Sequence, residues 1–136
     1  MNKLVIIMLL QVIFPVIGLA QKSMYHVIAT VQRNMRTLDY GKVSPVDFDI
    51  VKTGNSSVTV KGKSYTVIKI DKEVKTDSIE SIQFTAQDSE GQEYIIKFSH
   101  EPYSQVALMK FQMILFDVNH PYDWTYYFSQ EPRKIE

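Results

Sequence analysis

The histidines are the residues best suited to acid–base or metal chemistry in this chain of 136 residues. Imidazole titrates near neutral pH and is a common metal ligand. In an antiparallel meander, His100 and His120 lie at opposite ends of one strand and cannot share a metal ion, because a strand rises about 3.3 Å per residue. His26 is expected at the same end as His100, so the one candidate cleft for an enzyme contains His26, His100, Glu101 and Tyr103. Histidines near strand ends are usually only polar surface, and an enzyme is therefore the weakest functional class.

Other residue patterns that support catalysis or cofactor binding are missing from the sequence. The chain has no cysteine, which removes thiol nucleophiles, zinc–thiolate sites and redox pairs. Its glycines are isolated, so no glycine-rich loop can hold a phosphate, and no serine lies in a Gly-x-Ser-x-Gly motif. Asp47 and Asp49 alternate with apolar residues and are expected on the wet face of a strand. We expect no catalytic residue, no cofactor and no metal.

The charges are balanced and mixed along the sequence. There are 15 basic and 15 acidic side chains, and they alternate closely in residues 71–77. Binding a phosphate backbone needs a concentrated positive face, so nucleic acid is not an expected partner. We interpret residues 71–77 as a solvated loop.

Residues 1–20 resemble a secretory signal peptide. Lys3 precedes an apolar stretch, and Gly18 and Ala20 fit a small-x-small cleavage site. A membrane anchor is the alternative, but the stretch is shorter than about 20 uninterrupted apolar residues and no basic cluster follows it. We therefore expect cleavage after Ala20, a soluble mature chain with no membrane span, and a secreted or periplasmic location. At this length, residues 21–136 are expected to form a single small β domain.

The mature chain predicts an all-β fold, because β-branched and aromatic residues alternate with polar ones between turn residues. About eight short strands joined by tight turns predict an antiparallel meander, since no helical segment is long enough for a parallel crossover. Eight strands either close into a small barrel or form a two-sheet β-sandwich. We favour the barrel, because closure removes exposed edges. In strand count and size, the predicted fold resembles lipocalin-like barrels, although no Gly-x-Trp signature lies near the first mature strand.

Three segments carry more specific expectations. The apolar residues of residues 64–70 change phase, which indicates a bulge or a strand covered on both faces. Residues 105–118 are predicted to form one long strand, because apolar residues alternate there; a helix is the alternative. In the first strand, four residues are predicted to share one face: Tyr25, Val27, Ala29 and Val31.

The aromatic residues of the C-terminal half suggest a binding function. Phe111, Trp124 and Tyr126 are the candidate ligand-binding residues, since Trp and Tyr add a polar group to an apolar body. The sequence thus predicts a secreted or periplasmic, non-enzymatic binding protein that holds a small apolar ligand in a β-barrel. The alternative is a cell-envelope protein–protein interaction module with a fully packed core. That module would use an exposed edge, or Tyr103 and Tyr122 in the loops.

Overall fold

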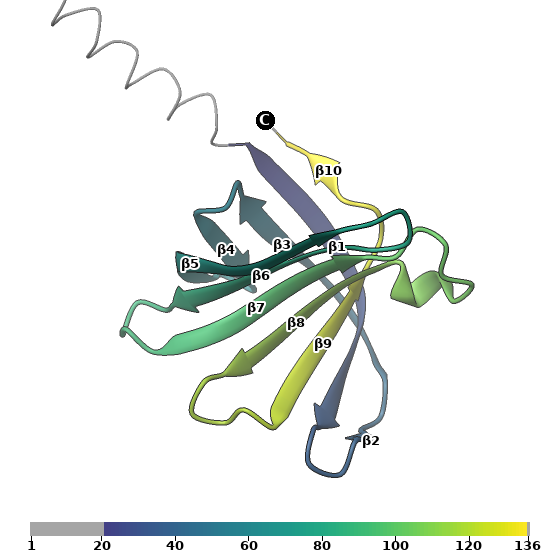
Figure 1. The fold of residues 1–136 in the computed structure, drawn as a ribbon, viewed down its shortest axis with the longest axis horizontal. Coiled ribbons are helices and arrows are strands. Elements are labelled where there is room, and N and C mark those ends of the chain that lie inside the picture. The colour runs from purple at the N-terminus through teal and green to yellow at the C-terminus, as the bar shows by residue number, and fades with distance from the viewer. Residues whose placement is uncertain (1–20, 136) are drawn as a thin grey trace, which may run out of the picture.

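The computed structural model describes residues 21–135, and β-strands make up most of that range (Figure 1). The predicted signal peptide lies outside the described residues. Within them, no helix is both long and apolar enough to cross a membrane. The strands are β1 (Lys22–Asn34), β2 (Asp39–Tyr40), β3 (Ser44–Thr53), β4 (Ser57–Val60), β5 (Lys63–Lys75), β6 (Glu80–Gln87), β7 (Glu93–His100), β8 (Phe111–Asp117), β9 (Asp123–Ser129) and β10 (Arg133–Lys134).

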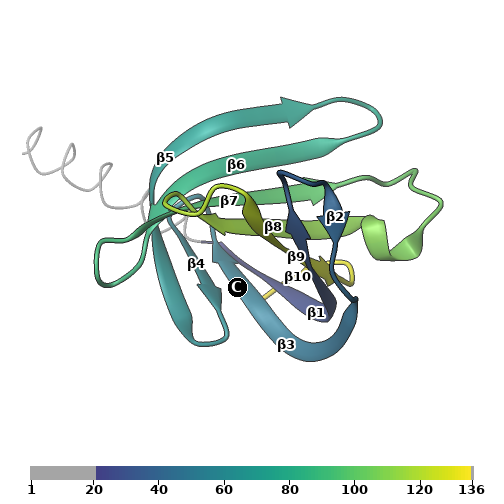
Figure 2. The same ribbon diagram turned by 90° about the horizontal axis from the view of Figure 1, so that it is seen from below.

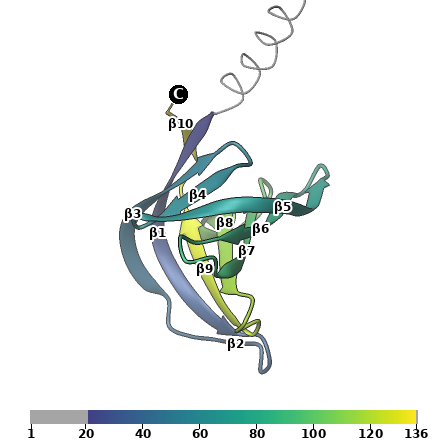
Figure 3. The same cartoon turned by 90° about the vertical axis from the view of Figure 1, so that its left-hand side faces the viewer.

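Eight of these strands form a closed antiparallel meander barrel. Pairing runs in the order β1, β3, β4, β5, β6, β7, β8 and β9, and β9 then pairs with β1 to close the ring. Figure 2 shows β5 and β6 along the upper edge of the barrel and β3 along its lower edge. The short strands β2 and β10 pair with β1, which runs the length of the molecule between them (Figure 3). The all-β prediction and the preference for a barrel over a sandwich are confirmed.

Tight turns set the hairpins of the meander. At the β4–β5 turn, Lys61 and Gly62 both have positive φ, at 51° and 78°. Two consecutive residues with positive φ match the twist of a two-residue hairpin, and glycine adopts this conformation without strain.

The barrel interior is packed with side chains through most of its length. Phe84 of β6 has no exposed surface, and its ring centroid lies 6.4 Å from that of Phe98 in β7. Closely packed apolar side chains of this kind are the main source of stability in a small domain. The buried members of this inner cluster are Val27, Ile50, Val58, Val60, Tyr65, Phe84, Ala86, Ile96, Phe98 and Met113.

A β-bulge in β1 changes which face its apolar residues use. The register of β1 against β3 and β9 shifts between Val27 and Ala29. Val27 therefore belongs to the inner cluster, whereas Ala29 and Val31 pack on the outside of the barrel wall. The prediction that Tyr25, Val27, Ala29 and Val31 share one face was wrong, because a bulge inserts one residue and reverses the alternation after it.

A second apolar cluster covers the outer face of β1, β8 and β9. Met113 and Tyr127 pack in the inner cluster, so their neighbours Ile114 and Tyr126 point outward. The short 3-10 helix η1 (Ala107–Met109) contacts β8 and β9. The members of this outer cluster are Ala29, Val31, Ile114, Tyr126 and Phe128, with Phe116 and Trp124 packed against them.

The segment 105–118 differs from its prediction in its first half. Only residues 111–117 are a strand, and residues 101–110 form a loop that contains η1. The loop is closed by a hydrogen bond from the Glu101 backbone N–H to the Lys110 carbonyl oxygen, 2.8 Å long. Both the long-strand prediction and the helical alternative are therefore wrong for residues 105–110, apart from one 3-10 turn.

The charged run at residues 71–77 is also corrected. β5 continues to Lys75, so most of the predicted loop is strand, and the turn to β6 lies at residues 76–79. The expected exposure is found, since Asp71, Lys72 and Glu73 are all exposed. The register of β5 against β6 shifts after Val67 and again after Ile70, which confirms the bulge predicted from the phase change.

An ion pair closes the end of the barrel that holds the β4–β5 and β6–β7 turns. Lys63 Nζ lies 3.4 Å from Asp88 Oδ2, and only 6% of the Asp88 side chain is exposed. Asp88 also accepts backbone hydrogen bonds from Glu90 and Gln92, at 2.9 and 3.0 Å. Burial alone would raise the pKa of Asp88. The hydrogen bonds from Gln92 and Glu90 and the nearby Lys63 ammonium outweigh this effect, so the pKa of Asp88 is lowered overall.

We expect Asp88→Asn to lower the Tm at neutral pH, because it removes the charge that Lys63 and the two N–H groups stabilise. A carboxyl whose pKa is lower in the folded state stabilises the protein above its unfolded pKa, about 4, and loses that effect as pH falls. The Tm difference from the native chain should thus shrink below about pH 4. Calorimetry across pH measures this, with the exposed Asp77→Asn as control. A pH-independent difference would contradict the role of the charge.

Candidate ligand-binding pocket

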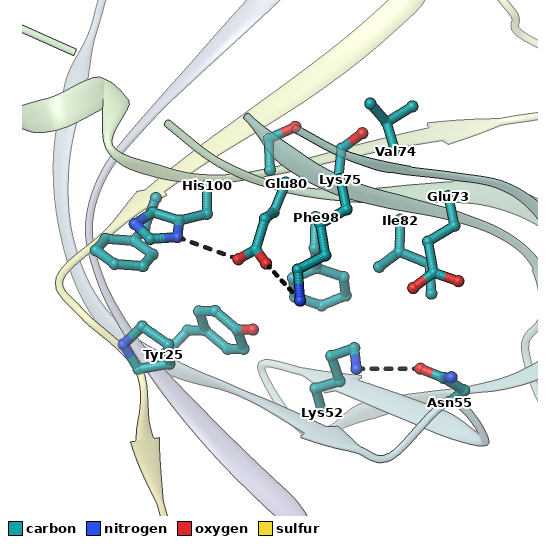
Figure 4. Close-up of a pocket in the computed structure, with 14 residues that line it drawn as sticks. Tyr25, Lys52, Asn55, Glu73, Val74, Lys75, Glu80, Ile82, Phe98 and His100 are labelled. Carbon is teal, nitrogen blue, oxygen red and sulfur yellow. Dashed lines mark hydrogen bonds and ion pairs between the residues drawn. The ribbon is translucent and has the colours of Figure 1, made fainter. Parts of the chain in front are cut away.

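A pocket opens at the end of the barrel opposite Asp88. Its volume is about 350 Å³. It is bordered by the starts of β1, β6 and β8 and by the ends of β3, β5 and β7. Figure 4 shows side chains from these strands turned toward one space. The pocket is the open mouth of the barrel, and the inner cluster forms its floor.

Aromatic side chains form the walls of the pocket. The rings of Tyr25 and Phe98 pack with centroids 5.1 Å apart. On the neighbouring wall, the imidazole of His100 stacks on the ring of Phe111, with centroids 4.3 Å apart and planes inclined by 8°. Val74, Ile82 and Pro132 add to the apolar lining. Such a surface suits a flat or chain-like apolar group of small size.

Glu80 organises the charged rim. Its carboxylate lies 3.5 Å from Lys75 Nζ and 3.6 Å from His100 Nδ1 (Figure 4). The three groups come from β5, β6 and β7, which are neighbouring strands. This carboxylate therefore already has cationic or hydrogen-bonding neighbours within the protein.

Lys52 of β3 brings a second ammonium group into the pocket. It donates hydrogen bonds to the Gly54 carbonyl oxygen, at 2.7 Å, and to Asn55 Oδ1, at 3.3 Å. Its Nζ lies 5.8 Å from the ring centroid of Phe98 and 5.7 Å from that of Phe84. Burial lowers the pKa of Lys52, and the charge of Glu73 opposes this shift. Among the described residues, no carboxylate lies within ion-pair distance of Lys52.

The hydroxyl of Tyr25 also points into the pocket (Figure 4). Burial raises the pKa of Tyr25, so the phenol stays protonated and can donate a hydrogen bond. Within residues 21–135, no side chain or backbone group hydrogen-bonds this hydroxyl. The pocket thus holds one hydroxyl whose donor is not used by the protein.

The three predicted ligand-binding residues do not share one cavity. Phe111 lines the pocket. Trp124 and Tyr126 lie on the outer face of the barrel, where Trp124 stacks on Phe116 with centroids 5.1 Å apart. Trp124 also donates a hydrogen bond from Nε1 to the Pro121 carbonyl oxygen, 2.9 Å long. The β9 aromatic that faces inward is Tyr127, which packs against the inner cluster.

The candidate enzyme cleft is not assembled either. His26 points outward, with Nε2 3.0 Å from Asp47 and Nδ1 2.9 Å from Asp49. The two aspartates lie on the wet face, as predicted, but they pair with this histidine. His100 lines the pocket, and Tyr103 is 77% exposed in the loop that follows it. In the part of the chain that the structure describes, no cluster of three or more His, Asp or Glu residues could hold a metal ion.

The sequence reasoning missed Tyr25 and Lys52 as pocket residues. The pairing register places Tyr25 opposite Ile50, and Lys52 opposite Val58, all on the inner face. Strand alternation from Ile50 already puts Lys52 on that face, and a lysine among inward residues was the available signal. Comparison with protein-family models, with curated proteins and with solved structures gives no match.

Proposed function

We propose that this protein is a secreted or periplasmic, non-enzymatic binding protein that holds a small apolar ligand at the open mouth of its lipocalin-like barrel. One observation carries the proposal: a pocket of about 350 Å³ with aromatic walls, next to a packed core. Ligand pockets typically have volumes of about 300–1,000 Å³ and apolar linings with a few polar groups. The volume therefore favours a ligand of about one or two rings, or a short alkyl chain.

The barrel is packed toward one end and open at the other, and this arrangement supports a preformed site. The inner cluster fills the barrel toward Asp88, so the walls at the mouth are held by strands that are already packed. Tyr25 and Phe98 belong both to this packing and to the pocket lining. A site on rigid strands loses little conformational entropy when a ligand binds.

Phe111→Ala is expected to weaken binding of a neutral aromatic probe by about tenfold, since it removes one apolar wall. We choose 1-naphthamide, which is small enough for the pocket. Phe111 is only partly buried, so the variant should stay folded. Calorimetric titration measures the Kd. Phe116→Ala, on the outer face, is the matched control, and it should leave the Kd unchanged. Equal weakening by both variants would contradict the pocket as the site.

Native mass spectrometry of the protein purified without detergent tests the natural ligand and the location together. A reproducible small adduct that is lost on denaturation supports the proposal. Cleavage after Ala20 predicts a polypeptide mass equal to that of a chain that begins at Gln21. A bare chain that also fails to bind 1-naphthamide, or a chain that retains residues 1–20, contradicts the corresponding part of the proposal.

A cell-envelope interaction module is the second candidate, and the outer face is the observation that favours it. Tyr40 is 55% exposed where it contacts Tyr126, and Leu108 and Met109 of η1 are also exposed. Tyr103 and Tyr122 are exposed in their loops. Apolar groups gathered on a surface often mark a protein contact. In the same mass spectrum, a second protein subunit in place of a small adduct would favour this candidate.

A further inference from the structure

We propose that the pocket takes its ligand as an organic anion, whose carboxylate accepts hydrogen bonds from Lys52 Nζ and the Tyr25 hydroxyl while its apolar part lies between Phe98 and Phe111. This inference rests on the proposed binding function and deepens it by naming the chemical class of the ligand. That class is a small monocarboxylic acid with an aromatic or short alkyl group.

The two donors converge from adjacent strands. Tyr25 is paired with Ile50 in β3, and Lys52 follows two residues later on the same inner face. Diagonal neighbours of this kind are about 7–8 Å apart at the backbone, which is within the reach of long side chains. Both side chains meet the same ring, since the Tyr25 ring packs on Phe98 at 5.1 Å and Lys52 Nζ lies 5.8 Å from the Phe98 centroid. A carboxylate above the edge of Phe98 can therefore reach both donors.

The ammonium of Lys52 is incompletely compensated. Its two hydrogen-bond acceptors, Gly54 and Asn55, are neutral, so its charge is solvated by the protein without being neutralised. An ammonium carries three protons, and these two acceptors leave one for a ligand. Burial weakens its hydration, as its lowered pKa indicates. A bound carboxylate would accept a charge-assisted hydrogen bond from this partly buried ammonium, where the interaction is screened less than at a fully exposed surface.

The other charged groups at the mouth leave this position to the ligand. Glu80 is occupied by Lys75 and His100, and these three groups together form their own network. Glu73 also lines the pocket and acts on Lys52 through its charge. Glu73 is an exposed residue, so solvent screens its charge and an anion can still bind deeper in the pocket. Some repulsion remains, and removing the charge of Glu73 should strengthen anion binding.

A matched probe pair isolates the carboxylate: 1-naphthoate is anionic at pH 7, and 1-naphthamide has nearly the same shape but no charge. We expect the full chain to bind the naphthoate about tenfold more tightly. Lys52→Met should abolish this preference, because it should lower the naphthoate affinity by about tenfold more than the naphthamide affinity, and Tyr25→Phe should reduce the preference. Glu73→Gln should increase it. Lys61→Met, at the β4–β5 turn on the far end of the barrel, removes the same charge and should have no effect.

The outcomes separate the two proposals. Equal affinity for both probes, or a preference that survives both Lys52→Met and Tyr25→Phe, would overturn the anion inference and leave the binding function standing. A preference lost equally in Lys61→Met would also overturn it, because net charge would then explain the effect. Failure to bind either probe would overturn the proposed function itself. Calorimetry gives the Kd values, and circular dichroism shows that each variant is folded.

Discussion

Replacing Phe84 with alanine is expected to lower the free energy of unfolding by about 3–5 kcal/mol, the range for truncating a large buried aromatic residue. Phe84 has no exposed surface and packs against Phe98 in the inner cluster. The substitution leaves a cavity that the surrounding barrel strands cannot close, because their pairing fixes their spacing. Urea unfolding followed by circular dichroism measures the loss.

Ile70→Ala is the matched control for this prediction. Ile70 lies directly opposite Phe84 in the register of β5 and β6, but it is 47% exposed. We expect a loss of less than about 1 kcal/mol there, because most of the side chain is already in water. A loss below about 1 kcal/mol for Phe84→Ala itself would contradict a filled barrel interior.

Tyr126→Ala is expected to cost about 3 kcal/mol of unfolding free energy and to leave probe binding at the mouth unchanged. Only 7% of Tyr126 is exposed, and its ring contacts those of Tyr40, Trp124 and Phe128 at centroid distances of 6.0–6.3 Å. Its loss should therefore weaken the outer cluster. The same unfolding assay, paired with titration of 1-naphthamide, measures both effects.

Tyr126→Phe serves as the control, because it keeps the ring and should cost less than about 1 kcal/mol. A parallel loss of probe affinity in folded Tyr126→Ala would place the ligand on the outer face and contradict the assignment to the mouth. Trp124→Ala provides a second test of the same kind, since Trp124 also packs on the outer cluster.

The strand pattern predicted the all-β barrel because most strands alternate apolar and polar residues and most hairpin turns carry glycine or other turn residues. The bulge in β5 was also readable, since its apolar residues change phase within one strand. The bulge in β1 was missed because Tyr25, Val27, Ala29 and Val31 fit one alternation, although the chain reverses its faces between Val27 and Ala29. The apolar, exposed Ile28 falls on the polar side of that pattern and was the available signal.

A buried apolar cluster on the outer face of the barrel explains why the candidate ligand-binding residues are separated. Trp124, Tyr126 and Phe128 do share one face of β9, as their spacing predicts, but that face is the outer one. The rule that the apolar face points inward fails here because the outer cluster also buries it, leaving Tyr127 as the aromatic that packs inside. The sequence groups Phe111 with Trp124 and Tyr126, but Phe111 lines the pocket at the mouth and the other two lie on the outer face of the wall.

Sequence reasoning also could not anticipate the loop at residues 101–110. Ala107 and Met109 continue the alternation of the strand that follows, but backbone hydrogen bonds at η1 and between Glu101 and Lys110 turn the chain away from the sheet. These bonds are set by tertiary placement of the loop beside β8 and β9. Local propensity is a weak guide where such contacts decide the conformation.

The most direct test of the account is a titration of the isotopically labelled protein with 1-naphthamide, followed by ¹H–¹⁵N NMR spectra. If the mouth of the barrel is the binding site, saturable shift changes will concentrate at Tyr25, Lys52, Phe98 and Phe111. The amides of Tyr40, Leu108 and Met109, on or beside the outer face, will stay in place. The absence of saturable changes, or changes centred on those outer residues, would contradict the claim that this protein binds small ligands at the mouth of its barrel.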